Sequence, residues 1–230
     1  MIEYDPLTAL IVVDVQNDFA DPAGSLAVRE GAAVIPILET EIAAARAAGA
    51  TILYTQDWHP AHTPHFAQDG GIWPVHCVQE SWGAAFHRAL TVSGPVIRKG
   101  SNGEDGYSGF TMRDPTSGDT VPTALEGILR ERAVHRVVIG GLATDYCVRW
   151  TGLDAVRLGF AATVLAAAVR AVELQPGDGD RALAELAAAA VTIDRSVRDV
   201  DLVPSARLAL EAISARAAQY ARRATGESAS

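Results

Sequence analysis

Short apolar runs alternate along this chain with longer stretches in which apolar residues recur every three or four positions. Continuous apolar runs predict strands buried on both faces, whereas the longer spacing predicts amphipathic helices. The predicted strands occupy residues 8–15, 50–56, 94–99, 135–141, 160–169 and 190–196. The predicted helices occupy residues 32–49, 121–134, 144–159, 179–189 and 206–223. Gly49 would close the first helix, Pro122 or Thr123 would start the second, and Thr144 would cap the third.

Strands that alternate with helices favour right-handed βαβ units. We therefore predict a single α/β domain in three layers, a mostly parallel sheet of about six strands with helices on both faces. The domain is expected to span residues 1–205, followed over 206–230 by a helical extension and a tail from 224. The extension would serve either packing or subunit contact in a homo-oligomer.

Composition and charge narrow the classes of protein. The 230 residues suffice for one large domain with a sizeable core, and the formal net charge of −9 argues against a nucleic-acid partner. No apolar run reaches the length of a membrane span, and the first residues lack a basic leader. Two cysteines do not form a disulfide framework, so we expect a cytoplasmic protein that acts on a small molecule.

Polar residues stand where four of the predicted strands end. Asp14, Asp57 and Lys99 close the first three strands, and Cys147 follows the fourth. Ligands of open α/β sheets bind outside the carboxyl ends of the strands. The common placement therefore predicts a site with a carboxylate, an ammonium and a thiol at one edge of the sheet.

Each of these residues has an alternative interpretation. Near the start of a helix and close to a lysine, Cys147 would be a thiolate nucleophile, but it could equally be a small buried residue. Cys77 is the weaker candidate for the nucleophile. Asp14 follows an apolar run, so burial would raise its pKa toward that of a general base, whereas Asp18 suits a capping role better. Lys99 competes with its neighbour Arg98, since only one of the two faces inward.

Four of the six histidines lie between positions 59 and 76. Asp57, His59, His65 and His76 form a set of three imidazoles and one carboxylate, which suits zinc, iron or manganese. His62 fits the pattern less well. The alternative is that these histidines are ordinary loop residues.

Five segments resemble the nicotinamidases, also called pyrazinamidases, of the isochorismatase-like cysteine hydrolases. They are LIVVDVQNDFADPAGSLAV (10–28), TQDWHPAHTPHF (55–66), WPVHCV (73–78), RKGSNGEDGYSGF (98–110) and GLATDYCVRWTGLDAV (141–156). The similarity runs in order from about residue 8 to 200. The motif D-x-H-x5-H followed by W-P-x-H is the most discriminating part.

The resemblance implies roles for particular residues. It implies a catalytic triad of Asp14, Lys99 and Cys147, and an oxyanion hole from the backbone amides of Ala143 and Cys147 after a cis peptide at Leu142–Ala143. It also implies one divalent metal ion per subunit, zinc before iron or manganese. The metal ligands would be Asp57, His59, His65 and His76, and the ring pocket would be lined by Phe19, Trp73 and Tyr107.

The activity implied is hydrolysis of nicotinamide, and of analogues such as pyrazinamide, to the acid and ammonia through a thioester, as in NAD salvage. The alternatives are an amidase or ureidohydrolase of the same superfamily that acts on a carbamoyl or ureido substrate, and a metal-stabilised binding protein without activity. Three features depart from the family pattern: Pro22-Ala23 beside Gly24, Tyr146 where a histidine is frequent, and the C-terminal extension.

Overall fold

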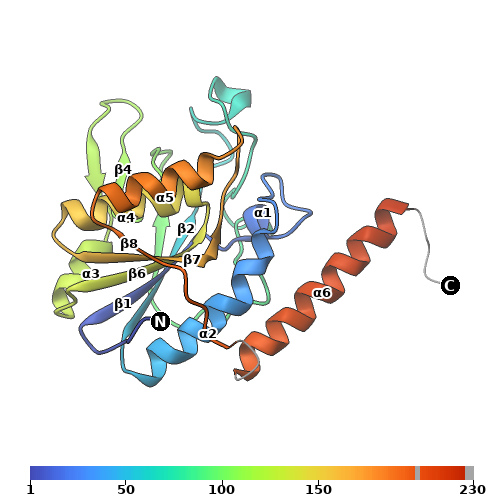
Figure 1. Ribbon diagram of the computed structural model, residues 1–230. Coiled ribbons are helices and arrows are strands. Elements are labelled where there is room, and N and C mark those ends of the chain that lie inside the picture. Colours follow the sequence, from blue (N-terminus) through green and yellow to red (C-terminus); the bar gives the residue numbers. More distant parts are fainter. Residues whose placement is uncertain (200–202, 226–230) are drawn as a thin grey trace.

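The sheet at the centre of the computed structural model has six parallel strands in the order β3-β2-β1-β6-β7-β8 (Figure 1). The structure describes residues 1–199 and 203–225. The strands are β1 Thr8–Val13, β2 Thr51–Asp57, β3 Val96–Lys99, β6 Arg136–Leu142, β7 Ala161–Arg170 and β8 Thr192–Asp194. The described helices longer than one turn are α2 Val34–Ala47, α3 Leu125–Glu131, α4 Arg149–Arg157, α5 Asp178–Ala188 and α6 Pro204–Thr225.

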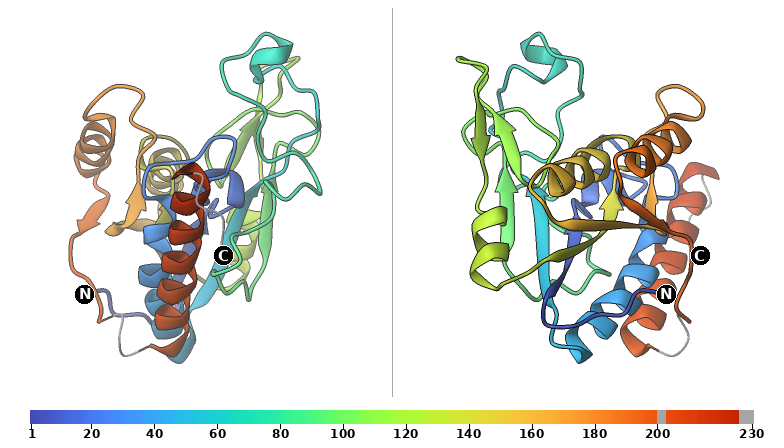
Figure 2. Two further views of the ribbon diagram at one scale, coloured as in Figure 1. Left: turned by 90° about the vertical axis from the view of Figure 1, so that its right-hand side faces the viewer. Right: turned by 60° about the vertical axis from the view of Figure 1, so that its left-hand side comes forward.

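Both faces of the sheet are buried, as the continuous apolar runs predict. Because successive strand residues point to opposite faces, Leu10 and Val12 pack toward α2, while Ile11 and Val13 pack in the cluster that contains α3, α4 and α5. Figure 2 shows α6 outside α2, running alongside it. The predicted three-layer α/β fold is confirmed, with α6 as an additional cover on one side.

The main departures from the predicted elements lie between positions 111 and 148. Residues Thr111–Arg113 (β4) and Thr120–Pro122 (β5) form a small antiparallel hairpin that the sequence pattern did not indicate. Pro122 therefore belongs to a strand, and helix α3 begins only at Leu125, whose amide donates to Thr123 Oγ1. The predicted helix over 144–159 consists of a π-helical turn, η3 (Thr144–Val148), followed by α4. Ala143, not Thr144, occupies its N-cap position.

At the C-terminus, helix α6 begins two residues before the predicted start, at Pro204, and continues through Thr225. The predicted tail lies outside the described residues from 226 on. A division between a domain that ends at 205 and an extension stays a prediction. No helix in the described ranges is both long and apolar enough to cross a membrane.

Gly141 lies near the carboxyl end of β6, directly against the backbone of β1. Its φ is +128°, and an added Cβ would lie 2.0 Å from the carbonyl oxygen of Val13. The obstacle is backbone rather than a flexible side chain, so it cannot move aside. Strands β1 and β6 can approach this closely because position 141 has no side chain.

We expect Gly141→Ala to lower the free energy of unfolding by about 3–5 kcal/mol, the sum of backbone strain and overpacking. Urea denaturation followed by circular dichroism measures the change. Gly127→Ala is the matched control, because an added Cβ there meets nothing within 4 Å and lies in helix α3. It should be neutral or slightly stabilising. Equal midpoints for the two variants would contradict the expected clash.

Candidate active site and metal centre

The carboxyl ends of four adjacent strands bring the predicted residues together. Asp14 follows β1, Asp57 ends β2 and Lys99 ends β3, with Asp57 and Lys99 paired in register. Cys147 lies in η3, directly after β6, and β6 neighbours β1. Strands β1 and β6 lie at the point where chain connections diverge to the two sides of the sheet, which is where open α/β sheets bind ligands.

Lys99 connects the acid and the thiol. Its ammonium Nζ lies 2.8 Å from Asp14 Oδ2 and 3.6 Å from Cys147 Sγ. The other carboxylate oxygen of Asp14 accepts a 2.6 Å hydrogen bond from Thr55 Oγ1. All four side chains are buried. The structure thus brings Asp14, Lys99 and Cys147 within contact distance, and it adds Thr55, which the sequence did not single out.

The same ammonium also contacts the metal-ligand candidate Asp57. Lys99 Nζ lies 2.7 Å from Asp57 Oδ1, so a single buried cation is shared by two carboxylates. Arg98, the other candidate of the pair, points away and lies over the Trp58 ring at 3.9 Å. The alternation along β3, in which positions 97 and 99 are buried, selects Lys99 as the inward residue.

Burial and charge shift the pKa values of these groups in different directions. Burial raises the pKa of Asp14, and its nearest cation, Lys99, lowers it only in part. For Asp57 burial also acts upward, but Lys99 and the neighbouring histidines outweigh it and bring the pKa well below its ordinary value. Burial alone would lower the pKa of Lys99, yet the two carboxylates raise it well above its ordinary value, so it is charged.

The charges and burial around Cys147 oppose the low-pKa thiolate that the sequence suggested as one possibility. Burial raises the pKa of Cys147 well above its ordinary value, and the carboxylates of Asp14 and Asp57 act in the same direction. The Lys99 ammonium opposes this shift but does not overcome it. This direction favours the neutral thiol, so a nucleophilic step calls for transfer of its proton to a base.

The backbone around the site is unusual at two places. Asp14 has a φ of +47°, a left-handed conformation that is uncommon for a residue other than glycine. Strand β1 therefore ends at Val13, before the predicted end of the first strand. The peptide bond between Leu142 and Ala143 is cis, as the resemblance predicts.

Three of the histidines face one another beside this cluster. One imidazole nitrogen from each of His59, His65 and His76 lies within 4.8 Å of the other two. Asp57 is adjacent, with its Oδ2 3.8 Å from His59 Nε2. Burial lowers the pKa of His65 to about 4, and it lowers the pKa of His76 as well. Neutral imidazoles beside an ionised carboxylate are the ligand state that a divalent metal requires.

Hydrogen bonds orient two of these rings toward the common centre. His65 Nδ1 bonds Thr63 Oγ1 at 2.9 Å, and His76 Nδ1 bonds the Pro74 carbonyl oxygen at 2.7 Å. These contacts leave the Nε2 atoms for another ligand, and His65 Nε2 is buried without a hydrogen-bond partner. Outer hydrogen bonds of this kind fix the tautomer of metal-binding histidines. The residues therefore fit a divalent ion held by Asp57, His59, His65 and His76.

The residues set aside in the sequence lie elsewhere. The His62 side chain is 79% exposed and pairs with Asp69 at 3.1 Å. Cys77 is buried outside the pocket, and burial raises the pKa of its thiol well above the ordinary value. Asp18 accepts hydrogen bonds from the backbone amides of Ser25 and Cys77, so it joins two loops rather than capping a helix.

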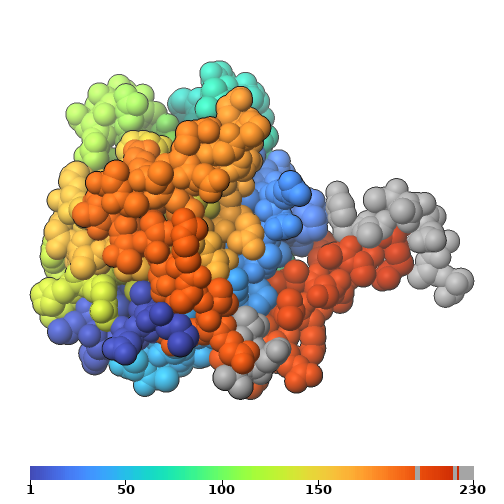
Figure 3. Space-filling model, in the orientation of Figure 1, coloured from blue at the N-terminus to red at the C-terminus, as the bar shows by residue number. Residues whose placement is uncertain are grey.

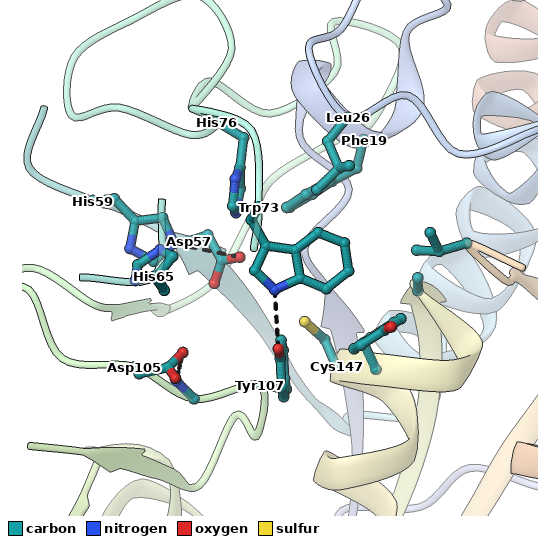
Figure 4. A pocket seen from close by; sticks show the side chains of 14 residues that line it. Phe19, Leu26, Asp57, His59, His65, Trp73, His76, Asp105, Tyr107 and Cys147 are labelled. Carbon is teal, nitrogen blue, oxygen red and sulfur yellow. Dashed lines mark hydrogen bonds and ion pairs between the residues drawn. The ribbon is translucent and has the colours of Figure 1, made fainter. Parts of the chain in front are cut away.

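A pocket connects the thiol with the histidines. In Figure 4 the imidazole groups and Cys147 lie on opposite sides of Trp73, whose indole Nε1 donates to Tyr107 OH at 3.0 Å. Phe19, Trp73 and Tyr107, to which the resemblance assigns a role in substrate binding, all line this pocket. Lining residues that the sequence did not predict are Leu26, Asp105, Gly106 and Val172. They lie on loops, which have no regular spacing of apolar and polar residues from which their positions could be predicted.

Tyr146 lines the same pocket. Its ring lies 5.0 Å from that of Trp73 and 5.1 Å from that of Tyr107, with ring planes tilted or perpendicular. The position that departs from the family pattern therefore contributes an aromatic wall.

The fold and the site define a hydrolytic enzyme with a buried acid, amine and thiol beside a histidine cluster. Comparison with known proteins gives the same class. The chain matches the Isochorismatase domain over residues 8–196 and belongs to this family. It is 36% identical to the nicotinamidase of Escherichia coli (strain K12) over 206 residues, which cover 82% of this chain and 94% of that protein.

Solved structures agree with this assignment. The pyrazinamidase of Pyrococcus horikoshii in complex with zinc is 41% identical, with a TM-score of 0.73, over 83% of this chain and all of that one. The PnC1 protein of L. infantum in complex with nicotinate is 35% identical, with a TM-score of 0.75, over 84% and 95% of the two chains. By this similarity the chain falls among the amidohydrolases that act on linear amide bonds.

Proposed function

We propose that the protein hydrolyses nicotinamide, and analogues such as pyrazinamide, to the corresponding acid and ammonia. The observation that carries the proposal is a pocket with aromatic walls, lined by the thiol of Cys147, the buried carboxylate of Asp57 and the ring of His65, whose Nε2 has no hydrogen-bond partner. Similarity to a nicotinamidase and to a nicotinate-bound relative supports the choice of substrate.

Attack on the amide begins with a proton transfer. Asp14, whose pKa burial raises, takes the proton of Cys147 as the sulfur adds to the amide carbon. Lys99 stays charged and stabilises the carboxylate and the sulfur during this step. The backbone amides of Ala143 and Cys147 are proposed to hold the oxyanion.

Collapse of the adduct breaks the carbon–nitrogen bond. Asp14 returns its proton to the leaving nitrogen, ammonia departs, and the acyl group stays on Cys147 as a thioester. Asp14 then accepts a proton from water as the water oxygen attacks the thioester carbon. Release of the acid returns the proton to Cys147 and completes the cycle.

A divalent ion would be held by Asp57, His59, His65 and His76. When bound, it supplies an electrophilic centre that orients the ring nitrogen of the substrate. The zinc complex of a relative supports zinc, and the ligand set also accepts iron or manganese. A homo-oligomer, a cytoplasmic location and a part in NAD salvage stay predictions.

The test is to incubate the purified protein with nicotinamide and to measure nicotinate and ammonia, which should form in a ratio of one to one. Benzamide, which has the same shape but no ring nitrogen, should have a kcat/KM lower by about 100-fold or more because the polar end of the pocket is then unpaired. Turnover of a carbamoyl or ureido substrate is measured in the same way as a third comparison. Faster turnover of that substrate than of nicotinamide would refute the proposal in favour of the alternative amidase activity.

A further inference from the structure

Helix α6 lies outside the part of the chain that matches the family. The match ends at residue 196, whereas α6 begins at Pro204. The helix is nevertheless docked on the domain, because Ala206 and Ala209 are buried and Ile213 packs against the core cluster that contains α2. In Figure 3 the described part of α6 extends beyond the rounded body formed by the other elements.

One ion pair connects this helix with the loop that begins at the end of α1 (Asn17–Ala20). Arg216 Nε lies 3.0 Å from Asp21 Oδ2, and the Asp21 side chain is only 5% exposed. The other oxygen of that carboxylate accepts a hydrogen bond from the Ala23 amide. His87 is a second neighbour of this carboxylate, with its Nε2 3.9 Å from Asp21 Oδ2. Burial lowers the pKa of His87, so at neutral pH Arg216 provides the positive charge beside Asp21.

Asp21 starts the loop that forms one wall of the pocket. Phe19, just before it, and Leu26, within the loop, both line the pocket between the thiol and the imidazoles. The segment closes on itself, since the Val28 amide donates to the Phe19 carbonyl and the Leu26 amide donates to the Asp18 carbonyl. A displacement at Asp21 would therefore reach both lining residues.

We propose that Arg216 is a positioning residue, which holds the wall formed by residues 17–28 from outside the family domain. Arg216 does not line the pocket, so its effect would be indirect. Loss of its charge leaves a buried carboxylate without a cationic partner, which favours opening of the loop. The effect on substrate rests on the proposed function, whereas the effect on the loop does not.

The experiment compares Arg216→Gln with Arg207→Gln in the full-length protein. Arg207 lies on the same helix, is exposed, and pairs only with Glu211 among its described contacts of opposite charge. Arg216→Gln should raise KM for nicotinamide about 3- to 10-fold, with little change in kcat, within the range found for residues that act without touching ligand. Backbone amides of residues 17–28 should exchange with deuterium faster, while those of the central sheet should not. Arg207→Gln should match the wild type in all three measurements.

The outcomes separate the two proposals. If the wild type does not turn over nicotinamide, the proposed function fails, and the deuterium exchange of residues 17–28 still tests the role of Arg216. Unchanged exchange and KM in Arg216→Gln would overturn that role. Equal effects of both variants, or faster exchange throughout the sheet, would show a merely structural helix and would overturn it as well. If Arg216→Gln does not fold, Arg216→Lys, which keeps the charge but changes the geometry, should show the same local changes at smaller size.

Discussion

Cys147→Ala should lower kcat for nicotinamide by about 10⁴-fold or more, the scale of loss when a nucleophile is removed. The sulfur lies 3.6 Å from Lys99 Nζ and within 4.8 Å of a carboxylate oxygen of Asp14, and no other thiol lines the pocket among the described residues. The variant should keep the metal content of the wild type, because Cys147 is not among the proposed ligands. Steady-state ammonia release and elemental analysis measure the two quantities.

Cys77→Ala is the matched control for this variant. Cys77 is also fully buried, so its replacement removes a comparable side chain from the interior. It lies outside the pocket, and we expect turnover close to that of the wild type. Substantial nicotinate formation by Cys147→Ala, or an equal loss in both variants, would reject the cysteine mechanism.

His59→Ala should lower the affinity for the divalent ion by at least about 100-fold. Loss of a hydrogen-bond partner of a metal ligand already lowers metal affinity by about 10- to 100-fold, and loss of the ligand itself should cost more. The three imidazoles face one another in one cluster, so loss of one leaves two imidazoles and Asp57. Competition with a chelator, followed by elemental analysis, gives the metal affinity. Calorimetric titration with nicotinate should show weaker binding.

His62→Ala is the control for the metal prediction. Its side chain is exposed and pairs with Asp69 instead of facing the cluster. The variant should retain the metal and bind nicotinate as the wild type does. Full metal occupancy in His59→Ala would contradict the proposed ligand set, and unchanged nicotinate affinity without metal would contradict the role of the ion in orienting the ring.

The sequence was informative wherever a residue directly follows a buried strand. Asp14, Asp57 and Lys99 could be placed at one edge because each stands at the end of a predicted strand and parallel strands end together. The histidine cluster could be predicted from its density alone. Both patterns can be recognised within short segments of the sequence. Once the fold class is known, they are enough to predict which residues meet in space.

The remaining features depend on contacts between distant segments. The pKa of Cys147 depends on how deeply η3 is buried and on its distance from Asp14, which no local pattern contains. The β4–β5 hairpin has strands of three residues, too short for a period to be recognised. Asp105 and Leu26 line the pocket from loops, whose course the sequence pattern does not predict.

The shared ammonium of Lys99 has a consequence for turnover. When Asp14 gains the proton of Cys147 in the proposed reaction, it loses its negative charge, yet Lys99 keeps Asp57 as a counter-ion 2.7 Å away. The buried ammonium therefore has an ionised carboxylate beside it at every stage of the proposed proton transfer. Two carboxylates around one ammonium thus allow Asp14 to change its protonation state while the buried lysine keeps an ionised neighbour.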